Sequence, residues 1–455
     1  MKNRLLPVTC AIVLALSVPA TVLVAQSVQQ QQAEADRFKE LEEFLAVYRK
    51  VKLSYVDKVD DKQLMEGAIQ GMLASLDPHS AFLDKSDFSS LQTQIDGEYG
   101  GLGLTVTLED EAVKVIAPTK DTPADKAGIK SGDFITHLDG KLIIGGTLDE
   151  AVEAMRGVPG TSIKLTIFRP GRDAPFDVTI TRAVIDLKPV RWEVKNRIGV
   201  ISITGFSEQT GADVVAAVSG IKKSLGGNPL GYIIDLRSNP GGILDEAVSV
   251  SDAFLSSGEI VSERGRDKRD IQRWWTERAV PGDVTGGAPI IVLVDAGSAS
   301  ASEIVAGALQ DHHRGLVMGE RSFGKGSVQS VLPLTRDTGL RLTVARYHLP
   351  SGRSVQEGGI KPDIRVPQLT DPDYKKRVSV RESDLRRHLV NELKDNSKDL
   401  EEDRIDDPRF AMTAEQLKAK GIDDFQLYYA METLQRLGSK TMKLAAKPLK
   451  GRAQN

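Results

Sequence analysis

Hydrophobic and polar residues follow each other along the N-terminal part of the chain with the spacing of amphipathic helices. Residues 38–56, FKELEEFLAVYRKVKLSYV, place apolar residues three and four positions apart, which is typical of a helix with one buried face. Residues 61–76, DKQLMEGAIQGMLASL, repeat this spacing, and the DPHS turn at residues 77–80 ends it. We therefore expect a helical N-terminal region over residues 27–95, which begins with a polar, glutamine-rich linker.

Residues 96–185 follow a different pattern, in which glycines are frequent and short β-branched runs alternate with polar residues. The run at 99–118, YGGLGLTVTLEDEAVKVIAP, predicts a loop, a strand, a turn and a second strand. Residues 122–143 predict a short helix and a hairpin, residues 147–157 an amphipathic helix, and residues 161–182 a final hairpin. This order predicts a separate small domain.

Residues 186–368 alternate between strand and helix patterns, which predicts an α/β core. The run PIIVLVDAG at 289–297 is almost continuously apolar, as expected of a strand that is covered on both faces. A helix pattern over 301–313 follows it directly, and LRLTVARYHLPSGRSVQ at 340–356 predicts a strand, a turn and another strand. Further strands are expected within 197–206, 231–242 and 315–320.

The tail, residues 369–455, is strongly charged. Helix patterns cover ESDLRRHLVNELK at 382–394, TAEQLKAKG at 413–421 and DFQLYYAMETLQRLG at 424–438. The last sixteen residues, 440–455, carry five lysines or arginines and no acid. We interpret them as a solvated end rather than as a basic interaction tail.

Composition places the chain among soluble multidomain proteins. Of its 455 residues, 40% are hydrophobic and 27% are charged. The net charge of −3 favours neither nucleic acid nor an anionic membrane surface as a partner. The single cysteine, Cys10, lies in the N-terminal apolar run, so the remaining chain has no disulfide and no thiol chemistry. No spacing in the sequence is typical of a metal site.

The N-terminus has the pattern of an export signal. A basic head, MKNR, precedes an uncharged apolar run from Leu5 to Ala25. Cleavage after Ala25 would leave Leu23 where a small residue is preferred, and the run is also long enough to span a bilayer. Residues 1–26 are therefore a signal peptide or a membrane anchor. We expect a chain exported to the periplasm or cell envelope of a bacterium, either free or anchored to the inner membrane.

Candidate chemistry begins with DAGSASASEIVAG at 295–307, in which Ser298, Ser300 and Ser302 alternate before a helix pattern. A serine at the start of a helix faces backbone N–H groups and the positive end of the helix dipole, which suits a nucleophile. Ser300 and Glu303 also form the S-x-x-E pattern of a capping box, which is a purely structural role. Position and spacing alone do not separate the three serines.

A serine nucleophile needs a base, and this stretch contains no histidine. A buried lysine can serve, since loss of water lowers its pKa by disfavouring the charged form. Lys325 in RSFGKGSVQSVLPL is a candidate because glycines flank it and let the backbone approach closely. If the segment is a strand, Lys325, Ser327 and Gln329 share one face, so Gln329 is placed to hold the amine.

An acyl-transfer site also needs two N–H donors for a developing oxyanion. One is the N–H that follows the nucleophile, and the other can come from SNPGG at 238–242, whose glycines leave their N–H groups unobstructed. From the motif alone, a plain type II turn is the favoured interpretation of NPGG.

Histidines offer weaker alternatives. His79, in the DPHS turn, is a candidate base, although no carboxylate and nucleophile can be paired with it from the sequence. His312 and His313 suggest a metal site but lack an evident third ligand, so they are better interpreted as charges at a helix end.

Several long motifs together resemble the carboxyl-terminal processing peptidases, also called tail-specific proteases. The likeness runs from about Phe38 to Pro367. Its motifs are DLRSNPGGIL, GSASASEIVAGALQD, SFGKGSVQ and YHLPSGRSVQEGGIKPDI. Residues 122–135, TPADKAGIKSGDFI, resemble a PDZ domain of the bacterial, circularly permuted kind. The resemblance implies a mixed, multidomain α/β fold with a ClpP/crotonase-like protease core, an inserted PDZ domain, a helical N-terminal region and a helical C-terminal tail.

The expected domains are then a PDZ domain over 96–185, a Ser-Lys protease core over 186–368 and a tail over 369–455. By the resemblance, Ser300 is the nucleophile, Lys325 the general base and Gln329 its orienting residue. The resemblance also supplies the binding groups, which are the oxyanion-hole residues Ala301 and Gly242 and the PDZ carboxylate loop of Gly101, Leu102, Gly103 and Leu104.

The resemblance and the N-terminal pattern together predict that the protein is an exported serine endopeptidase. It would recognise the C-terminus of an unfolded or partly folded protein through its PDZ domain and cleave through an acyl-enzyme, without a metal or organic cofactor. Expected partners are protein or peptide substrates with apolar C-termini, an adaptor lipoprotein and further copies of the chain in a homo-oligomer, but no nucleic acid. Two alternatives stay open: a PDZ-based scaffold or regulatory binding protein with a non-catalytic core, and an enzyme that acts on thioesters.

Overall fold

The structure, a computed structural model, describes residues 39–109, 111–267, 269–277, 282–376, 379–393 and 407–445. The expected export segment lies outside these ranges. Among the described helices, none combines the length and apolarity that a membrane span requires. The chain divides into two compact units, Met1–Met72 and Leu73–Asn455.

The first unit confirms the predicted N-terminal helices. Residues 39–54 are helical, and α2 (Asp61–Ala74) begins in this unit. The carboxylate of Asp61 joins the two helices, because it accepts hydrogen bonds from the Tyr48 hydroxyl at 2.8 Å and from Lys52 Nζ at 2.6 Å.

The second unit begins with the DPHS turn, and two elements after the turn were not predicted individually. Strand β1 (Ala81–Leu83) precedes α3 (Lys85–Asp96). The side chain of Asp84 caps the start of α3 by accepting the N–H of Asp87, and Gly97 ends the helix at a φ of 73°. Helix α3 matters because its residues line two pockets described below.

The predicted small domain is present, with a sheet in the order β3-β4-β5-β7-β8. Helix α5 begins with a capping box formed by Thr147 and Glu150, and its apolar face packs on this sheet. Strands β2 and β9 pair antiparallel at the entry to and the exit from the domain, which marks it as an insertion in the chain. The elements are β2 (Glu98–Gly101), β3 (Leu104–Glu109), β4 (Ala112–Pro118), α4 (Pro123–Lys126), β5 (Phe134–Leu138), β6 (Lys141–Leu142), α5 (Leu148–Met155), β7 (Ser162–Phe168), β8 (Phe176–Thr181) and β9 (Ala183–Asp186).

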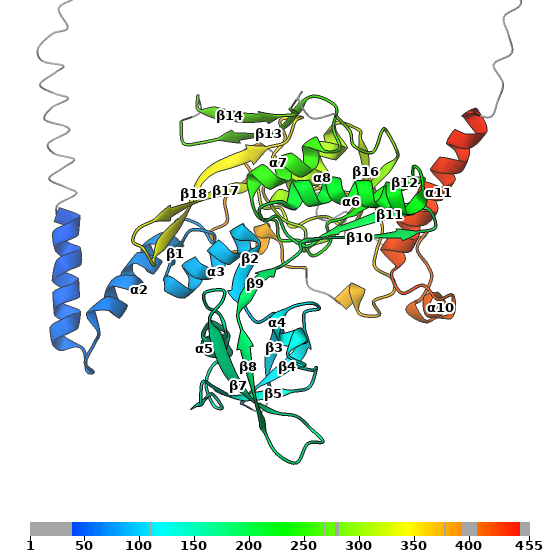
Figure 1. The fold of residues 1–455 in the computed structure, drawn as a ribbon. Helices are drawn as coiled ribbons and strands as arrows, with labels where there is room; N and C mark the ends of the chain where they lie inside the picture. The colour runs from blue at the N-terminus through cyan, green and yellow to red at the C-terminus, as the bar shows by residue number, and fades with distance from the viewer. Residues whose placement is uncertain are drawn as a thin grey trace, which may run out of the picture. The chain divides into compact units, whose positions relative to one another are not determined.

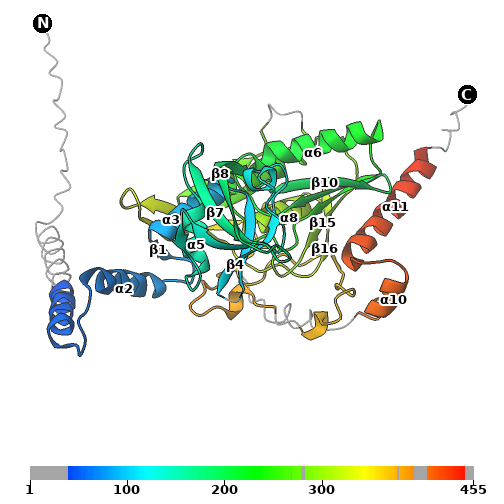
Figure 2. The same ribbon diagram turned by 60° about the horizontal axis from the view of Figure 1, so that its bottom comes forward.

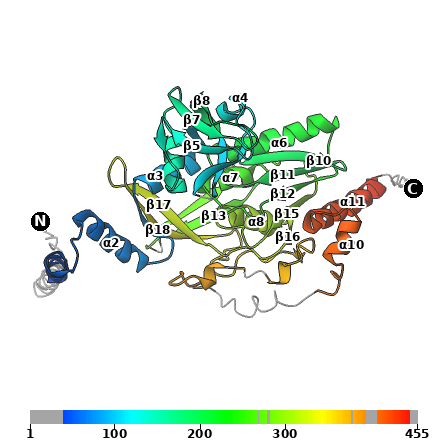
Figure 3. The same ribbon diagram turned by 90° about the horizontal axis from the view of Figure 1, so that it is seen from below.

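The core contains a six-stranded sheet in the order β10-β11-β12-β15-β16-β19, parallel from β11 onward. Helices α6, α7 and α8 cover one face and α11 covers the other (Figures 2 and 3). Every residue of β15 is therefore buried, as its apolar run predicted. The elements are β10 (Val190–Lys195), β11 (Ile198–Ile203), α6 (Thr210–Leu225), β12 (Gly231–Asp235), α7 (Leu244–Asp252), β15 (Ile290–Val294), α8 (Ala301–Asp311), β16 (Gly315–Gly319), β19 (Ile364–Arg365), α10 (Ala414–Ala419) and α11 (Phe425–Ala445).

A second sheet, of five antiparallel strands, extends beside the core (Figure 1). Strand β18 pairs with β1, β13 and β17, so it connects the DPHS turn to the segment that carries Gln329. Its strands are β1, β13 (Glu259–Arg264), β14 (Ile271–Trp275), β17 (Ser327–Pro333) and β18 (Gly339–His348). The second strand predicted within 340–356 is wrong, because residues after Leu349 form a turn and a loop instead.

The tail confirms two predicted helices, α10 and α11, and corrects a third. Residues 382–393 contain only a short 3₁₀ turn, η2 (Glu382–Asp384), after η1 (Tyr374–Lys376). The physical reason is that Glu382 is fully buried and Asn391 nearly so, and their side chains bind core groups, which holds this segment in an irregular path.

Candidate active site

The three alternate serines have different surroundings. Ser298 is buried and its hydroxyl donates to the carbonyl of Leu236 at 2.7 Å. Ser302 is also buried and donates to the carbonyl of Asn239 at 2.9 Å. Ser300 lines a pocket of about 710 Å³, and within the described residues its hydroxyl has no hydrogen-bond partner. Of the three, Ser300 therefore offers a free hydroxyl to a ligand.

The backbone at Ser300 adopts a conformation that L-residues seldom take. Its φ is 55° and its ψ is −113°, at the junction between the loop after β15 and helix α8. The predicted capping box is half formed: the carboxylate of Glu303 accepts the N–H of Ser300 at 2.8 Å, but the serine hydroxyl does not cap the helix. The turn thus holds the hydroxyl toward the pocket and away from the helix end.

Two N–H groups beside Ser300 are free to bind an anion. Those of Ala301 and Gly242 have no acceptor among the described residues, and both residues line the same pocket. The N–H of Gly241 is instead used by the side-chain oxygen of Asn239 at 2.9 Å. A Cβ on Gly242 would lie 2.1 Å from the carbonyl oxygen of Phe206, so the close approach of this loop requires glycine.

Lys325 lies in the loop before β17, so the condition under which it would share a strand face with Ser327 and Gln329 is not met. Its glycine neighbours allow tight packing, since a Cβ on Gly324 or Gly326 would lie 2.8 Å from backbone atoms of Glu357 or Gln356. Burial lowers the pKa of Lys325 to about 8. Of the nearby charges, Glu382, Glu303 and Asp77 raise this pKa and Arg341 lowers it.

Gln329 contacts Lys325 from strand β17. Its Oε1 accepts a hydrogen bond from Lys325 Nζ, and its Nε2 donates to Ser327 Oγ at 3.0 Å and Thr343 Oγ1 at 3.1 Å. A register shift between Val328 and Gln329 accompanies this placement. Ser300, Lys325 and Gln329 all line the same pocket, although no hydrogen bond joins Ser300 to Lys325 in the described structure.

Glu303 connects the serine turn to the lysine loop. Its fully buried carboxylate accepts four hydrogen bonds, from the N–H groups of Ser300, Gly324 and Lys325 and from the Ser322 hydroxyl. Burial raises the pKa of Glu303 to about 7, and the four donors counteract this effect. The sequence indicated a capping or structural acid, but it did not show that one carboxylate holds both loops.

Tyr347 provides a second connection, which the sequence did not suggest. Its buried hydroxyl donates to the carbonyl of Lys325 at 2.6 Å and lies 3.2 Å from the carbonyl of Ser300. Tyr347 occurs in the quoted YHLPSGRSVQ motif, so the motif was the available signal. Together, Glu303 and Tyr347 hold the two loops through backbone atoms and make no hydrogen bond to the side chains of Ser300 and Lys325.

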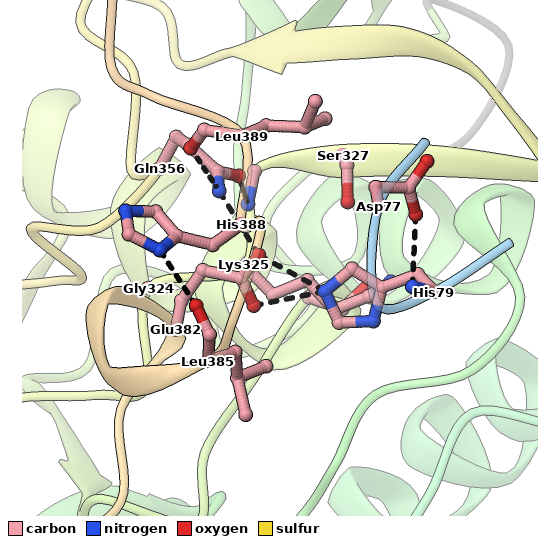
Figure 4. Close-up of polar contacts among 12 residues, drawn as sticks. Asp77, His79, Gly324, Lys325, Ser327, Gln356, Glu382, Leu385, His388 and Leu389 are labelled. Atoms are coloured by element: carbon pink, nitrogen blue, oxygen red, sulfur yellow. Dashed lines mark hydrogen bonds and ion pairs between the residues drawn. The ribbon is translucent and has the colours of Figure 1, made fainter. Parts of the chain in front are cut away.

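Residues of the tail lie close to the loop that carries Lys325, and Glu382 is one of them (Figure 4). Glu382 is fully buried and contacts His79 Nε2 at 2.9 Å and Gln356 Nε2 at 3.0 Å. Gln356 in turn accepts the N–H of Gly326 at 2.9 Å. His79 therefore has a carboxylate partner, which could not be identified from the sequence, but it does not line the pocket of Ser300.

The described residues contain no cluster of three or more metal-ligating side chains. His312 is instead the C-cap of α8, and its Nε2 contacts the carbonyl of Glu259 at 2.7 Å. This placement supports the structural interpretation of the histidine pair.

A second pocket, of about 390 Å³, lies between the inserted domain and α3 and has the predicted loop on its wall. Gly101, Leu102, Gly103 and Leu104 all line it, and the N–H groups of Leu102 and Gly103 have no acceptor among the described residues. Helix α5 and strand β3 also contribute to its lining. Gln94 of α3 lines both this pocket and the pocket of Ser300.

Comparisons with known proteins agree in three regions of the chain. Residues 197–366 match peptidase family S41, residues 100–180 match the PDZ domain, and residues 15–87 match the N-terminal domain of the activating protease CtpB.

Two relatives match most of this chain at substantial identity. The chain is 49% identical over 370 residues to a carboxy-terminal-processing protease of Bartonella bacilliformis, which covers 81% of this chain and 84% of the relative. It is 35% identical over 351 residues to the carboxy-terminal processing protease CtpB of Bacillus subtilis, covering 75% and 70%. Among solved structures, a photosystem II D1 C-terminal processing protease aligns with 29% identity and a TM-score of 0.42, covering 70% of this chain and 86% of that one.

Proposed function

The chain belongs to the carboxy-terminal processing proteases of peptidase family S41, and we propose that it cleaves peptide bonds with Ser300 as nucleophile and Lys325 as general base. One observation carries this proposal: a free serine hydroxyl and a partly buried lysine amine of lowered pKa line one pocket together with two free N–H groups. Those are the parts that a serine acyl-transfer site requires.

The lowered pKa of Lys325 makes it a usable base. With a pKa of about 8, roughly a quarter of the lysine is neutral at pH 7.5, against about 0.1% for an ordinary lysine. The neutral amine removes the proton of Ser300, and the serine oxygen attacks the carbonyl carbon of the substrate. The oxyanion that forms accepts hydrogen bonds from the N–H groups of Ala301 and Gly242.

The intermediate then collapses to an acyl-enzyme. The Lys325 ammonium transfers its proton to the leaving amine as the peptide C–N bond breaks. A water molecule, deprotonated by the same lysine, attacks the ester and releases the new C-terminus. Because no hydrogen bond joins Ser300 to Lys325 beforehand, the proton transfer requires the two side chains to come within hydrogen-bond distance when substrate binds.

Substrate choice is assigned to the PDZ domain. Its pocket presents free N–H groups at Leu102 and Gly103, which suit a C-terminal carboxylate, while strand β3 offers an edge for an added strand. We assign apolar C-termini of unfolded or partly folded proteins as the ligands. Gln94 lines both pockets, so α3 supplies a physical route by which an occupied PDZ domain influences the Ser300 pocket.

The cellular setting is part of the proposal and is supported by the N-terminal sequence. The basic head and the apolar run from Leu5 to Ala25 favour export to the periplasm or cell envelope. An adaptor lipoprotein and a homo-oligomer are consistent with that setting. Fusion of residues 1–40 to alkaline phosphatase tests the export: an inactive fusion would contradict it.

The catalytic proposal is tested by digesting one unfolded protein with the wild-type, Ser300→Ala and Lys325→Ala chains and mapping the cuts by mass spectrometry. Both variants should lose cleavage. Ser219→Ala, an exposed serine of α6, is the matched control and should cut as the wild type does. Continued cleavage by Ser300→Ala would refute the site, and full biological function of both inactive variants would favour a PDZ scaffold.

A further inference from the structure

Gln329 is itself held by groups to which the proposed mechanism assigns no role. Its Nε2 donates to Thr343 Oγ1 at 3.1 Å on the neighbouring strand β18. The Thr343 hydroxyl donates to Asp77 Oδ1 at 3.1 Å. A continuous path of hydrogen bonds therefore runs from Asp77 through Thr343 and Gln329 to Lys325.

Asp77 is a buried residue of the DPHS turn, with 4% of its surface exposed. Its carboxylate accepts the N–H groups of His79 and Ser80, each at 2.8 Å, and the Ser80 hydroxyl at 2.8 Å. Although burial acts to raise it, the pKa of Asp77 lies below its ordinary value because these donors stabilise the charged form. Pairing of β1 with β18 brings this turn beside Thr343.

An ionised carboxylate only accepts hydrogen bonds, and this fixes the donor and the acceptor in every hydrogen bond of the path. The proton of the Thr343 hydroxyl must point to Asp77, so the threonine oxygen is left as an acceptor. An acceptor at Thr343 selects the NH₂ end of the Gln329 amide, and the carbonyl end then faces Lys325.

The direction of this amide matters for a lysine base. A neutral amine has two N–H groups and one lone pair, and the lone pair must be free to take the serine proton. Gln329 Oε1 accepts a hydrogen bond from one N–H of Lys325 and leaves the lone pair of the amine available. With the amide reversed, its NH₂ group would donate to that lone pair and block the base.

We propose that Asp77 is a positioning residue of the Ser-Lys site, which acts through Thr343 to keep the carbonyl end of Gln329 on Lys325. This inference rests on the proposed function. Its elements lie far apart in the sequence, since the DPHS turn precedes the inserted PDZ domain and Lys325 follows it.

The test compares Thr343→Val, Thr343→Ser and Asp77→Asn in the full-length chain. The assay measures kcat, KM and the pH dependence of kcat on an unfolded reporter peptide. Thr343→Val removes the hydroxyl at nearly constant volume, and kcat should fall about tenfold, the effect of one hydrogen bond of ordinary strength. KM should stay unchanged, and the apparent pKa of the kcat profile should fall. Thr343→Ser restores the hydroxyl and should keep kcat within about twofold of wild type.

Asp77→Asn keeps an acceptor for the turn but removes the charge, so it should fold and show a smaller loss of kcat than Thr343→Val. Thr179→Val, at an exposed site on β8 of the PDZ domain, is the matched control. A merely structural role would lower the melting temperature and leave the kcat profile of the folded enzyme unchanged.

The outcomes separate the two proposals. Wild-type kcat and pH profile in both Thr343→Val and Asp77→Asn, or equal impairment of Thr343→Ser and Thr343→Val, would overturn the role of Asp77. If Thr343→Val does not fold, the decision rests on Asp77→Asn and on rescue by Thr343→Ser. Continued activity of Ser300→Ala or Lys325→Ala would instead overturn the proposed function.

Discussion

Replacement of Lys325 by methionine should make the protein more stable. The native state holds this lysine where its pKa is about 8, against 10.5 in the unfolded chain. Below pH 8 both states carry the proton, and the native state bears the cost of a buried charge. A difference of 2.5 pKa units corresponds to about 3 kcal/mol. Methionine has a similar length and no charge, but it loses the hydrogen bond to Gln329, so we expect a net gain of about 2–3 kcal/mol at pH 7.

The size of this stabilisation depends on pH in a defined window. Because the folded pKa is depressed, the cost is complete below pH 8, declines between pH 8 and 10.5, and is absent above that. The gain from Lys325→Met should follow the same course. Thermal unfolding at pH 7 should show a melting temperature roughly 3–6 °C above wild type, with the difference shrinking as the pH rises to 10.

The control is Lys223→Met, an exposed lysine near the end of α6, whose melting temperature should match wild type at each pH. A melting temperature of Lys325→Met at or below wild type at pH 7 would refute the reasoning. So would a gain that is independent of pH, since it would come from packing and not from a buried charge.

Four further predictions follow from the site. The kcat of the wild type should rise about tenfold per pH unit below pH 8 and level off above it, and a profile with its midpoint near 10.5 would contradict the buried base. Glu303→Gln replaces one acceptor oxygen by an NH₂ group, so two of the four donors around it lose their partner. The unfolding free energy should fall by roughly 3 kcal/mol, and kcat should fall as well. Glu193→Gln, at an exposed site, serves as the control. Gly242→Ala should abolish cleavage in peptide assays, because its Cβ would lie 2.1 Å from the carbonyl oxygen of Phe206 and would displace the loop that carries the N–H donor. Wild-type activity would contradict the requirement for glycine at this position. A peptide with a free apolar C-terminus should be cleaved faster than its C-terminal amide, and equal rates would count against carboxylate capture by the PDZ loop.

Local pattern predicted most elements of the fold correctly. The apolar run of β15, the helix spacing of α8 and the strand and turn order of the PDZ domain all depend on residues near each other in the chain. Prediction was wrong where distant contacts decide the structure. Residues 382–393 have a helical pattern, yet burial of Glu382 against His79 and Gln356 holds them in an irregular path.

The sequence also supplied the residue types of the site, namely a serine at a helix start, a lysine between glycines and a glycine-rich loop. It left Ser298, Ser300 and Ser302 equivalent until family resemblance selected one. Tertiary structure distinguishes them physically, because two of the hydroxyls are used by carbonyls of the loop after β12 and the third is free.

Glu303, Tyr347 and Asp77 owe their roles entirely to the folded structure. Each is an ordinary polar residue in a local pattern, and each contacts at least one partner that lies 22 or more positions away. The sequence by itself determined most of the helices and strands, since the periodicity of apolar residues is a local property. Only the packed structure decided which polar groups are buried together, and that burial sets the pKa of Lys325 and the direction of the hydrogen bonds around it.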